Sequence, residues 1–599
     1  MAFIHGGAFE EGSNRGPFDM YEANYIVQQH KVVYVTLNYR LGAFGWLSAG
    51  DAVPGNMGLL DQRAALQWVH DNIAFFGGNP SAVTVQGESA GAMSIGLHLV
   101  SPGSKGLFKR AIQESGVTGY PYRDSTEQAA YGMQFCKALQ CDVAGGSPPA
   151  ARALRGRLAQ RRSTPKQWMG RFALLSQAQR QQVAAAVWAS PAAQDILRAS
   201  PVTSATALAQ DFHTLAQAAP LVYDAAVDTL VRDVEGATCN VTCLQGATSD
   251  AVKHAAGEAT KDILSIIAAN WGHLFSAFLS WTPTVDGTIV PMNQVPAMQA
   301  GAFDTDVDLL VTTNTNEGAT FVYAAVDFEV PSFLIPLAYD LLWGEEASKN
   351  ISKNALYDAS KFADGRTPLS HVTTDHLFRC PAQLWASAVN AHGRSAFVGR
   401  YNHLWSFSWL FAKFGLPSIC TTEVCHAAEL PAVFHAVNTT GRANNITFTP
   451  AEMGLSVAMV QYWTNFAATG NPNTYPEGED ARVPLPMEWP QWTPSSQVDL
   501  SLNTTWTTET TPQCAMWDAI GYSQKNAAAK WHGVSSNFRT WPSEAPPMAV
   551  AALINTAASW LASAAVMAAC ALTATLGSLA FALRLRGRSA KQAGHVTVG

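Results

Sequence analysis

The 599-residue chain contains little charge and has no basic excess. Only 14% of its residues are charged, 48% are hydrophobic, and the formal net charge is −7 with a pI near 6.1. A nucleic-acid binder normally presents a basic face, and this acidic balance does not favour one. We therefore expect a folded globular protein with a large apolar core and no nucleic-acid partner.

The usual spacings of metal and phosphate sites are also missing. Zinc sites favour C-x₂-C doublets, whereas the close cysteine pairs here are Cys239/Cys243 and Cys420/Cys425. Disulfides formed in an oxidising compartment explain these pairs better than zinc, which is the alternative. No G-K-[ST] follows the glycine pair Gly6-Gly7, so a phosphate cradle is not expected there. We expect no metal and no organic cofactor.

Acceptor sites for N-glycosylation agree with an oxidising compartment. The Asn-x-Ser/Thr pattern occurs at Asn240, Asn350, Asn438, Asn445 and Asn503. Because some such sites arise by chance in a long chain, they support an extracellular or luminal location without deciding it.

The two ends of the chain differ in character. The first seven residues lack the basic and apolar regions of a signal peptide, and they resemble the end of a buried strand that enters a glycine turn. Residues 523–547 resemble a linker, and the uncharged residues 560–583 are long enough to cross a bilayer as a helix. The basic residues of the tail 584–599 predict that this tail is cytoplasmic. The alternative for 560–583 is a buried alanine-rich helix.

Strand and helix patterns alternate in the first part of the chain. We expect strands over 32–37, 83–86, 308–312 and 397–401, and helices over 61–76 and 90–100. This alternation predicts an α/β fold with a mainly parallel sheet flanked by helices. Residues 145–235 are rich in Ala, Gln and Arg and contain no motif. They are a helical insertion, a lid or a mistranslated stretch.

A candidate nucleophile lies between a predicted strand and a predicted helix. Residues 87–91 read GESAG and fit the G-x-S-x-G pattern, with Ser89 at its centre. The sharp strand-to-helix turn of this motif raises the serine hydroxyl above the sheet, and the helix N-terminus favours negative charge there. Alone the pattern is common in unrelated chains, and its position between a strand and a helix strengthens it.

The opening turn offers hydrogen-bond donors for the same chemistry. Ester hydrolysis passes through a tetrahedral oxyanion that needs preorganised backbone N–H groups. Gly6 and Gly7 leave the backbone bare, and with the amide of Ala90 they form a candidate oxyanion hole. The alternative for this glycine pair is an ordinary tight turn.

Longer segments extend the match to a known family. They are 56–62 (NMGLLDQ), 68–69 (WV), 76–80 (FGGNP) and 87–91 (GESAG). The chain closely resembles the type-B carboxylesterases, which include the cholinesterases, over roughly residues 3–120 and 280–520. The resemblance implies an α/β-hydrolase domain over residues 1–522. It also implies that the first strands and an early disulfide loop of such enzymes are missing here, so choline selectivity is not carried over.

The resemblance places the remaining members of a Ser-Glu-His triad. The segment 314–321 (NTNEGATF) resembles the family's acid segment and points to Glu317, and 424–430 (VCHAAEL) resembles its histidine segment and points to His426. A helix-capping Glu317 and a structural His426 are the alternatives. The implied activity is hydrolysis of small carboxylic esters through an acyl-enzyme.

Other features are implied by the same resemblance. It suggests a Cys380–Cys514 disulfide and a small Cys420–Cys425 loop ahead of His426, and it leaves the pairing of Cys136, Cys141, Cys239 and Cys243 open. Ala277 and Leu279 fall where cholinesterases have aromatic acyl-pocket residues, which implies a roomier acyl pocket.

Two other functions compete with an esterase. Neuroligin-like relatives are membrane-anchored adhesion proteins that typically lack the nucleophile, whereas Ser89, Glu317 and His426 are all present here. A lipase with an interfacial lid differs from an esterase mainly in the physical state of its substrate.

Overall fold

The structure is a computed structural model that describes most of the chain up to Tyr522. The residues described are 1–50, 53–144, 184, 187–188, 193–200, 202–208, 237–259, 279–326, 328–343, 345–438, 440–476, 484–494, 496–502, 505–507 and 511–522.

A central sheet of eight described strands organises the fold. Its order is β10-β9-β8-β7-β4-β3-β1-β2, and every neighbouring pair is parallel except β9 with β10. The strands are β1 (Ala2–Ile4), β2 (Val35–Leu37), β3 (Thr84–Glu88), β4 (Arg110–Glu114), β7 (Asp308–Asn314), β8 (Ala396–Tyr401), β9 (Gln497–Leu500) and β10 (Thr505–Thr507). The predicted α/β class with a mainly parallel sheet is confirmed.

Successive residues of the central strands enter two separate cores. Ile4 and Leu309 belong to one buried cluster, whereas their neighbours Phe3 and Leu310 belong to the other. Side chains alternate between the two faces of a strand, so each face of the sheet has its own core. The first core includes residues of α3 (Met57–Asn72), α4 (Ala90–Val100) and α20 (Cys380–Ala391), and the second includes residues of α24 (Pro450–Thr469).

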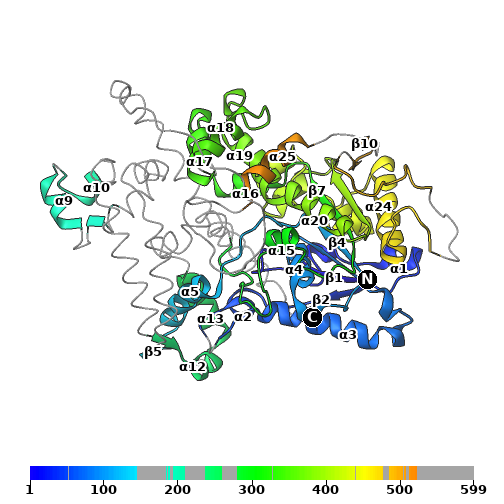
Figure 1. Ribbon diagram of the computed structural model, residues 1–599, viewed down its shortest axis with the longest axis horizontal. Helices are drawn as coiled ribbons and strands as arrows, with labels where there is room; N and C mark the ends of the chain where they lie inside the picture. The colour runs from blue at the N-terminus through cyan, green and yellow to red at the C-terminus, as the bar shows by residue number, and fades with distance from the viewer. Residues whose placement is uncertain are drawn as a thin grey trace, which may run out of the picture.

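A smaller antiparallel sheet pairs β5 (Asp142–Ala144) with β6 (Ala237–Cys239). Disulfides Cys136–Cys239 and Cys141–Cys243 fasten this sheet to α5 (Ser125–Ala138) and α12 (Val241–Gly246). Figure 1 shows these elements together with α13 (Ser249–Ala259) at the lower left, away from α24. The structure thus pairs these four cysteines, whose partners the sequence left open.

The remaining helices connect the strands or cover the sheet. They are η1 (Pro17–Asp19), α1 (Asn24–Gln29), α2 (Gly42–Trp46), η2 (Ile73–Phe76), η3 (Pro80–Ala82), η4 (Pro102–Ser104), α9 (Gln194–Ala199), α10 (Ala205–Leu208), α15 (Gln294–Ala300), α16 (Glu317–Ala325), η7 (Ser332–Leu334), α17 (Ile335–Trp343), α18 (Glu345–Lys353), η8 (Ala359–Lys361), α19 (Arg366–Thr373), the π-helix η9 (Thr374–Arg379), α21 (Trp409–Lys413), η10 (Ser418–Thr421), α22 (Leu430–Val433), η11 (Ala436–Asn438), α23 (Thr440–Asn444) and α25 (Pro512–Ile520).

Two element boundaries differ from expectation. The helix expected over 61–76 begins earlier, at Met57, and its last turn is the 3₁₀ helix η2. The strand expected over 32–37 is shorter, because only Val35–Leu37 pair with β1. The hydrophobic pattern locates such elements, whereas backbone hydrogen bonds, within a helix or to the adjacent strand, set their ends.

Several expected segments lie outside the described residues. These are the linker 523–547, the predicted transmembrane helix 560–583, the tail 584–599 and most of the insertion 145–235. Among the helices that the structure does describe, none combines the length and apolar character needed to cross a bilayer. The glycosylation candidates Asn240, Asn350 and Asn445 are exposed, whereas Asn503 is not described.

Candidate active site

A strained turn presents Ser89 at the end of β3. The backbone of Ser89 has φ 54° and ψ −122°, a conformation that residues with a side chain rarely adopt. A Cβ on Gly91 would lie 1.9 Å from the carbonyl oxygen of Ile4, and one on Gly87 would lie 2.7 Å from the carbonyl carbon of Gly91. Both motif glycines are therefore required by the close approach of backbone around the turn.

Helix α4 starts at Ala90, directly after the turn, so Ser89 occupies its N-terminal end. The first backbone N–H groups of a helix have no intrahelical acceptor and create a locally positive end. Ser89 is partly exposed, although Glu88 and Ala90 on either side of it are buried. The hydroxyl is thus accessible at a site that favours developing negative charge.

The glycine turn after β1 lies beside Ser89. Strand β1 pairs with β3 so that Ile4 is opposite Gly87. A Cβ on Gly6 would lie only 2.9 Å from Cβ of Ser89, and Gly7 has φ +114°. The bare backbone expected at this turn is required by its geometry, and its role as an oxyanion hole stays a prediction.

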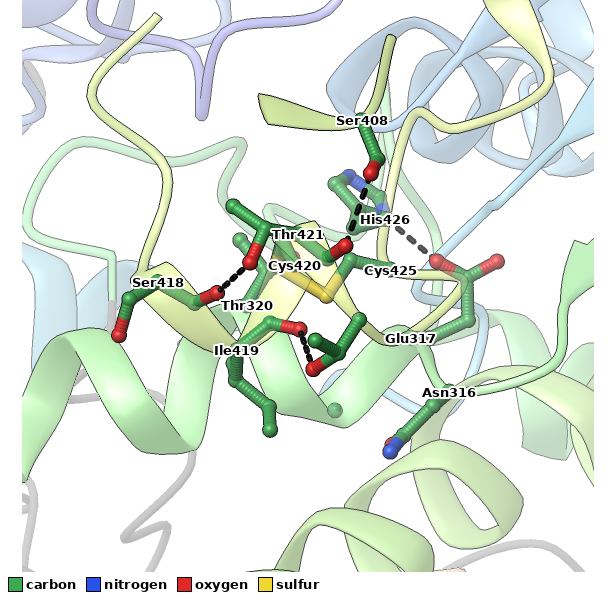
Figure 2. Close-up of a disulfide and its surroundings, with 12 residues drawn as sticks. Asn316, Glu317, Thr320, Ser408, Ser418, Ile419, Cys420, Thr421, Cys425 and His426 are labelled. Atoms are coloured by element: carbon green, nitrogen blue, oxygen red, sulfur yellow. Dashed lines mark hydrogen bonds and ion pairs between the residues drawn. A yellow bond between two sulfur atoms is a disulfide. The ribbon is translucent and has the colours of Figure 1, made fainter. Parts of the chain in front are cut away.

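His426 and Glu317 meet in a buried hydrogen bond. Nδ1 of His426 lies 2.7 Å from Oε2 of Glu317 (Figure 2). Glu317 has no exposed surface and opens α16, just after β7, and its Oε1 accepts a hydrogen bond from the backbone N–H of Asn314 at 2.6 Å. The two residues are 109 positions apart in sequence, so the fold brings them together.

The second ring nitrogen of His426 faces the residue before Ser89. Nε2 lies 3.3 Å from Oε1 of Glu88, the residue before Ser89. Among the described residues, Nε2 has no hydrogen-bond partner. The imidazole is therefore oriented by Glu317 at Nδ1, while its Nε2 faces the carboxylate of Glu88.

Aromatic rings enclose the imidazole. The ring centroids of Phe321 and Phe378 lie 5.0 and 5.6 Å from that of His426, both in edge-on arrangements. Phe321 comes from α16, and Phe378 from the π-helix η9. These rings restrict the tilt of the imidazole and exclude water from its sides.

Buried carboxyl groups surround this histidine. Burial alone lowers the pKa of His426, but its hydrogen bond to Glu317 and the nearby carboxylates Glu88 and Glu429 raise that pKa above its ordinary value. Burial also raises the pKa of Glu88 and of Glu429. Several carboxylates cannot all ionise in one buried space, so the group shares protons with His426.

One amide side chain connects these acids. Nδ2 of Asn314 donates to Oε2 of Glu429 at 2.6 Å and to Oγ of Ser115 at 2.9 Å. Ser115 in turn donates to Glu429 at 3.1 Å. Asn314 also donates to Oε1 of Glu317, so the network links Glu429 to the acid that contacts His426.

Sequence reasoning did not identify Glu88, Glu429 or Asn314 as parts of the site. Each nevertheless sits in a segment that had been singled out, because Glu88 belongs to the GESAG motif, Asn314 begins the acid segment, and Glu429 follows His426 by three positions. In the structure Glu88 also lies opposite a second buried carboxyl group, Glu114, across the β3–β4 pair.

The described residues contain no group of three or more His, Cys, Asp or Glu side chains arranged to hold a metal ion. Of the two predicted acyl-pocket positions, Ala277 lies outside the described residues. Leu279 is half-buried against the first core, and its carbonyl accepts a hydrogen bond from the buried Arg123 at 3.0 Å.

Comparisons with known proteins point to one family. The carboxylesterase family model matches residues 1–213 and 183–517. The chain is 27% identical over 543 residues to acetylcholinesterase of Electrophorus electricus, covering 84% of this chain and 68% of that protein. It is 27% identical over 598 residues to acetylcholinesterase of Danio rerio, covering 91% of this chain and 76% of that protein. It is 26% identical over 533 residues to the cAMP-regulated D2 protein of Dictyostelium discoideum, covering 87% of this chain and 75% of that protein.

Proposed function

The chain belongs to the carboxylesterase family, and on this premise we propose that it is a serine hydrolase that cleaves carboxylic esters through an acyl-enzyme. Ser89 is the nucleophile, His426 the general base and acid, and Glu317 the residue that orients His426. The proposal rests chiefly on one observation, the 2.7 Å Glu317–His426 hydrogen bond beside the strained turn that presents Ser89.

In this mechanism Nε2 of His426 removes the hydroxyl proton of Ser89 as the oxygen attacks the ester carbonyl. The amides of Gly6, Gly7 and Ala90 stabilise the tetrahedral oxyanion. His426 then gives its proton to the leaving alcohol, and water repeats the sequence on the acyl-enzyme. Glu317 keeps the proton of Nδ1 in place throughout, so that Nε2 is the nitrogen that accepts.

Labelling with a fluorophosphonate probe tests the nucleophile directly. We expect the wild-type protein to be labelled and Ser89→Ala to show no labelling, because the probe reacts only with an activated serine. A folded wild-type protein that is not labelled would contradict the proposal and favour the catalytically silent, neuroligin-like adhesion protein.

A series of esters with increasing acyl length tests the predicted pocket. With Ala277 and Leu279 in place of aromatic side chains, we propose that longer acyl groups are accepted. The expected result is a kcat/KM for butyryl esters at least equal to that for acetyl esters. A strong preference for acetyl esters would contradict the roomier pocket and leave the serine mechanism standing.

The four disulfides among the described residues indicate a domain that folds in an oxidising, extracellular or secretory environment. We propose that the predicted helix 560–583 anchors this domain to a membrane and that the predicted sequons carry glycans. Carbonate extraction of membranes tests the anchor, and the electrophoretic shift after glycosidase treatment tests the glycans.

A further inference from the structure

The geometry points to a positioning role for the Cys420–Cys425 disulfide: it holds His426 in register with the helix that supplies Glu317. This inference rests on the proposed function, since it concerns the general base of that reaction. Cys425 is the residue immediately before His426, and both cysteines are buried. The disulfide therefore acts on the backbone from which the imidazole projects (Figure 2).

The far end of the disulfide rests on α16. Sγ of Cys420 lies 3.6 Å from Oγ1 of Thr320, which is buried and one helical turn after Glu317. Residues three apart lie on the same side of a helix. The disulfide thus spans from the turn of α16 that carries the acid to the residue that precedes the base.

Hydrogen bonds make the disulfide loop a compact unit. Thr421 and Thr422 donate their hydroxyl groups to the carbonyls of Ser418 and Ile419, and Ser408 donates to the carbonyl of Thr421. Figure 2 shows hydrogen bonds of this loop as dashed lines around the sulfur bridge. A loop built in this way transmits the position of Cys420 to Cys425 with little freedom between them.

The loop is also hydrogen-bonded to the acid segment. The backbone N–H of Asn316 donates to the carbonyl of Val424 at 2.9 Å. Asn316 precedes Glu317, and Val424 precedes Cys425, so this hydrogen bond joins the acid segment to the histidine loop, and the disulfide contacts α16 separately through Thr320. Ala427, just after the histidine, has φ 66°, so the chain changes direction directly after His426.

The short loop makes global stabilisation a weak explanation for this disulfide. Cys420 and Cys425 are separated by 5 positions, whereas Cys141 and Cys243 are separated by 102. A disulfide restricts the unfolded chain less when the loop it closes is shorter. Its location beside His426 therefore accounts for it better than a contribution to unfolding free energy.

The ionisation of His426 reports on its position. The charged groups that face it are Glu317 on α16, Glu88 on β3, and Glu429 after the histidine loop. Burial lowers the pKa of His426 and its short hydrogen bond to Glu317 raises it, so an imidazole that loses this bond while it stays buried has a lower pKa. A change in position thus appears in the pH profile, whereas a loss of overall stability does not.

The test compares two variants, each lacking one disulfide. In Cys420→Ala/Cys425→Ala we expect kcat to fall about tenfold or more with KM within about twofold, because small displacements of a reacting group are costly. The acid limb of kcat/KM should move to lower pH. The control Cys141→Ala/Cys243→Ala should keep kcat and the pH limb of the wild type. A wild-type kcat and pH profile in the first variant, or a change in KM alone, would overturn the inference.

A second variant covers the case in which the first does not fold. Two glycines inserted after the exposed Thr422 keep the disulfide but lengthen its loop. We expect an intermediate loss of kcat and a smaller shift of the acid limb in the same direction. An insertion variant that folds with wild-type kcat and pH limb would count against the inference by itself.

One measurement separates this inference from the proposed function. The pKa of His426 can be followed by NMR of ¹³Cε1-labelled histidine, assigned with His426→Gln, without any turnover. If the wild type proves inactive, the proposed function fails, and a lowered pKa in the Cys420/Cys425 variant would still support the positioning role. An unchanged pKa would refute that role in an active or an inactive protein.

Discussion

The nucleophile turn and the histidine loop achieve rigidity by different means. Around Ser89 the backbone is so closely packed that a single added carbon atom would clash with Ile4. Around His426 the chain is held by a hydrogen bond from Nδ1 of the imidazole to Glu317, the Asn316–Val424 backbone bond, two aromatic rings and a disulfide. The first region should therefore respond to added volume, and the second to lost polar or covalent connections.

The largest effect is expected from Glu317→Gln. An amide in this position can hydrogen-bond His426 in the wrong tautomer and cannot stabilise an imidazolium, so kcat should fall by about 10⁴-fold. Because the side chain keeps its volume, the melting temperature should change little. Steady-state kinetics and calorimetry on the same preparation check both statements, and a kcat within tenfold of the wild type would contradict the assigned role.

Removing the Cys380–Cys514 disulfide should sharpen the contrast between stability and activity. Its cysteines are separated by 134 positions, so the loop-entropy estimate is about 5 kcal/mol of unfolding free energy, against about 2 kcal/mol for the Cys420–Cys425 loop. We expect Cys380→Ala/Cys514→Ala to unfold at much lower denaturant concentration. Its kcat, measured where it is still folded, should stay closer to wild type than that of the Cys420/Cys425 variant. A lower kcat in the Cys380/Cys514 variant than in the Cys420/Cys425 variant would contradict this distinction between the two disulfides.

Gly91→Ala tests the steric character of the nucleophile turn. The added Cβ would lie 1.9 Å from the Ile4 carbonyl oxygen, so β1 or α4 must shift, at a cost of roughly 3 kcal/mol. Gly454→Ala, in α24 where a Cβ meets nothing within 4 Å, is the matched control and should stabilise by about 0.5–1 kcal/mol. Chemical denaturation measures both, and equal stability of the two variants would argue against close packing at the turn.

Glu88→Gln should give the smallest change, a shift in pH dependence. The base reacts when His426 is neutral, so activity is lost as the pH falls through its pKa. The negative charge of Glu88 raises that pKa, and removing this charge should lower it. The acid limb of kcat/KM should therefore move to lower pH, with at most a severalfold change at its plateau. An unchanged acid limb would show that Glu88 is neutral in the working enzyme, and a shift toward higher pH would contradict the role assigned to its charge.

Local patterns in the sequence predicted the elements around Ser89 well. The helix expected over 90–100 has the bounds of α4, and the strand expected at 83–86 overlaps β3. The turn between them depends on residues adjacent in the chain, so one short motif carries most of the information. The buried strand Ala2–Ile4 before a glycine turn could be predicted for the same reason, because strand and turn are adjacent in the chain.

The surroundings of His426 were less accessible to such reasoning. The resemblance to a family indicated Glu317 and His426, but no spacing in the chain shows that Glu88 approaches Nε2 or that Asn314 joins Glu429 to Ser115. The cysteine pairs 136–239 and 141–243 were equally undetermined. These contacts connect residues far apart in the chain, and the sheet order that brings them together is a property of the whole fold.

Residue types and local periodicity were thus enough to specify the α/β class and the sharp serine turn, because each depends on neighbours in sequence, whereas the resemblance to a family supplied Glu317 and His426. Only the tertiary structure decided which carboxyl groups share the buried space around His426, which cysteines pair, and how the Cys420–Cys425 loop meets α16. The physical reason is that burial and proximity, which set ionisation and orientation, arise when distant segments pack against one another.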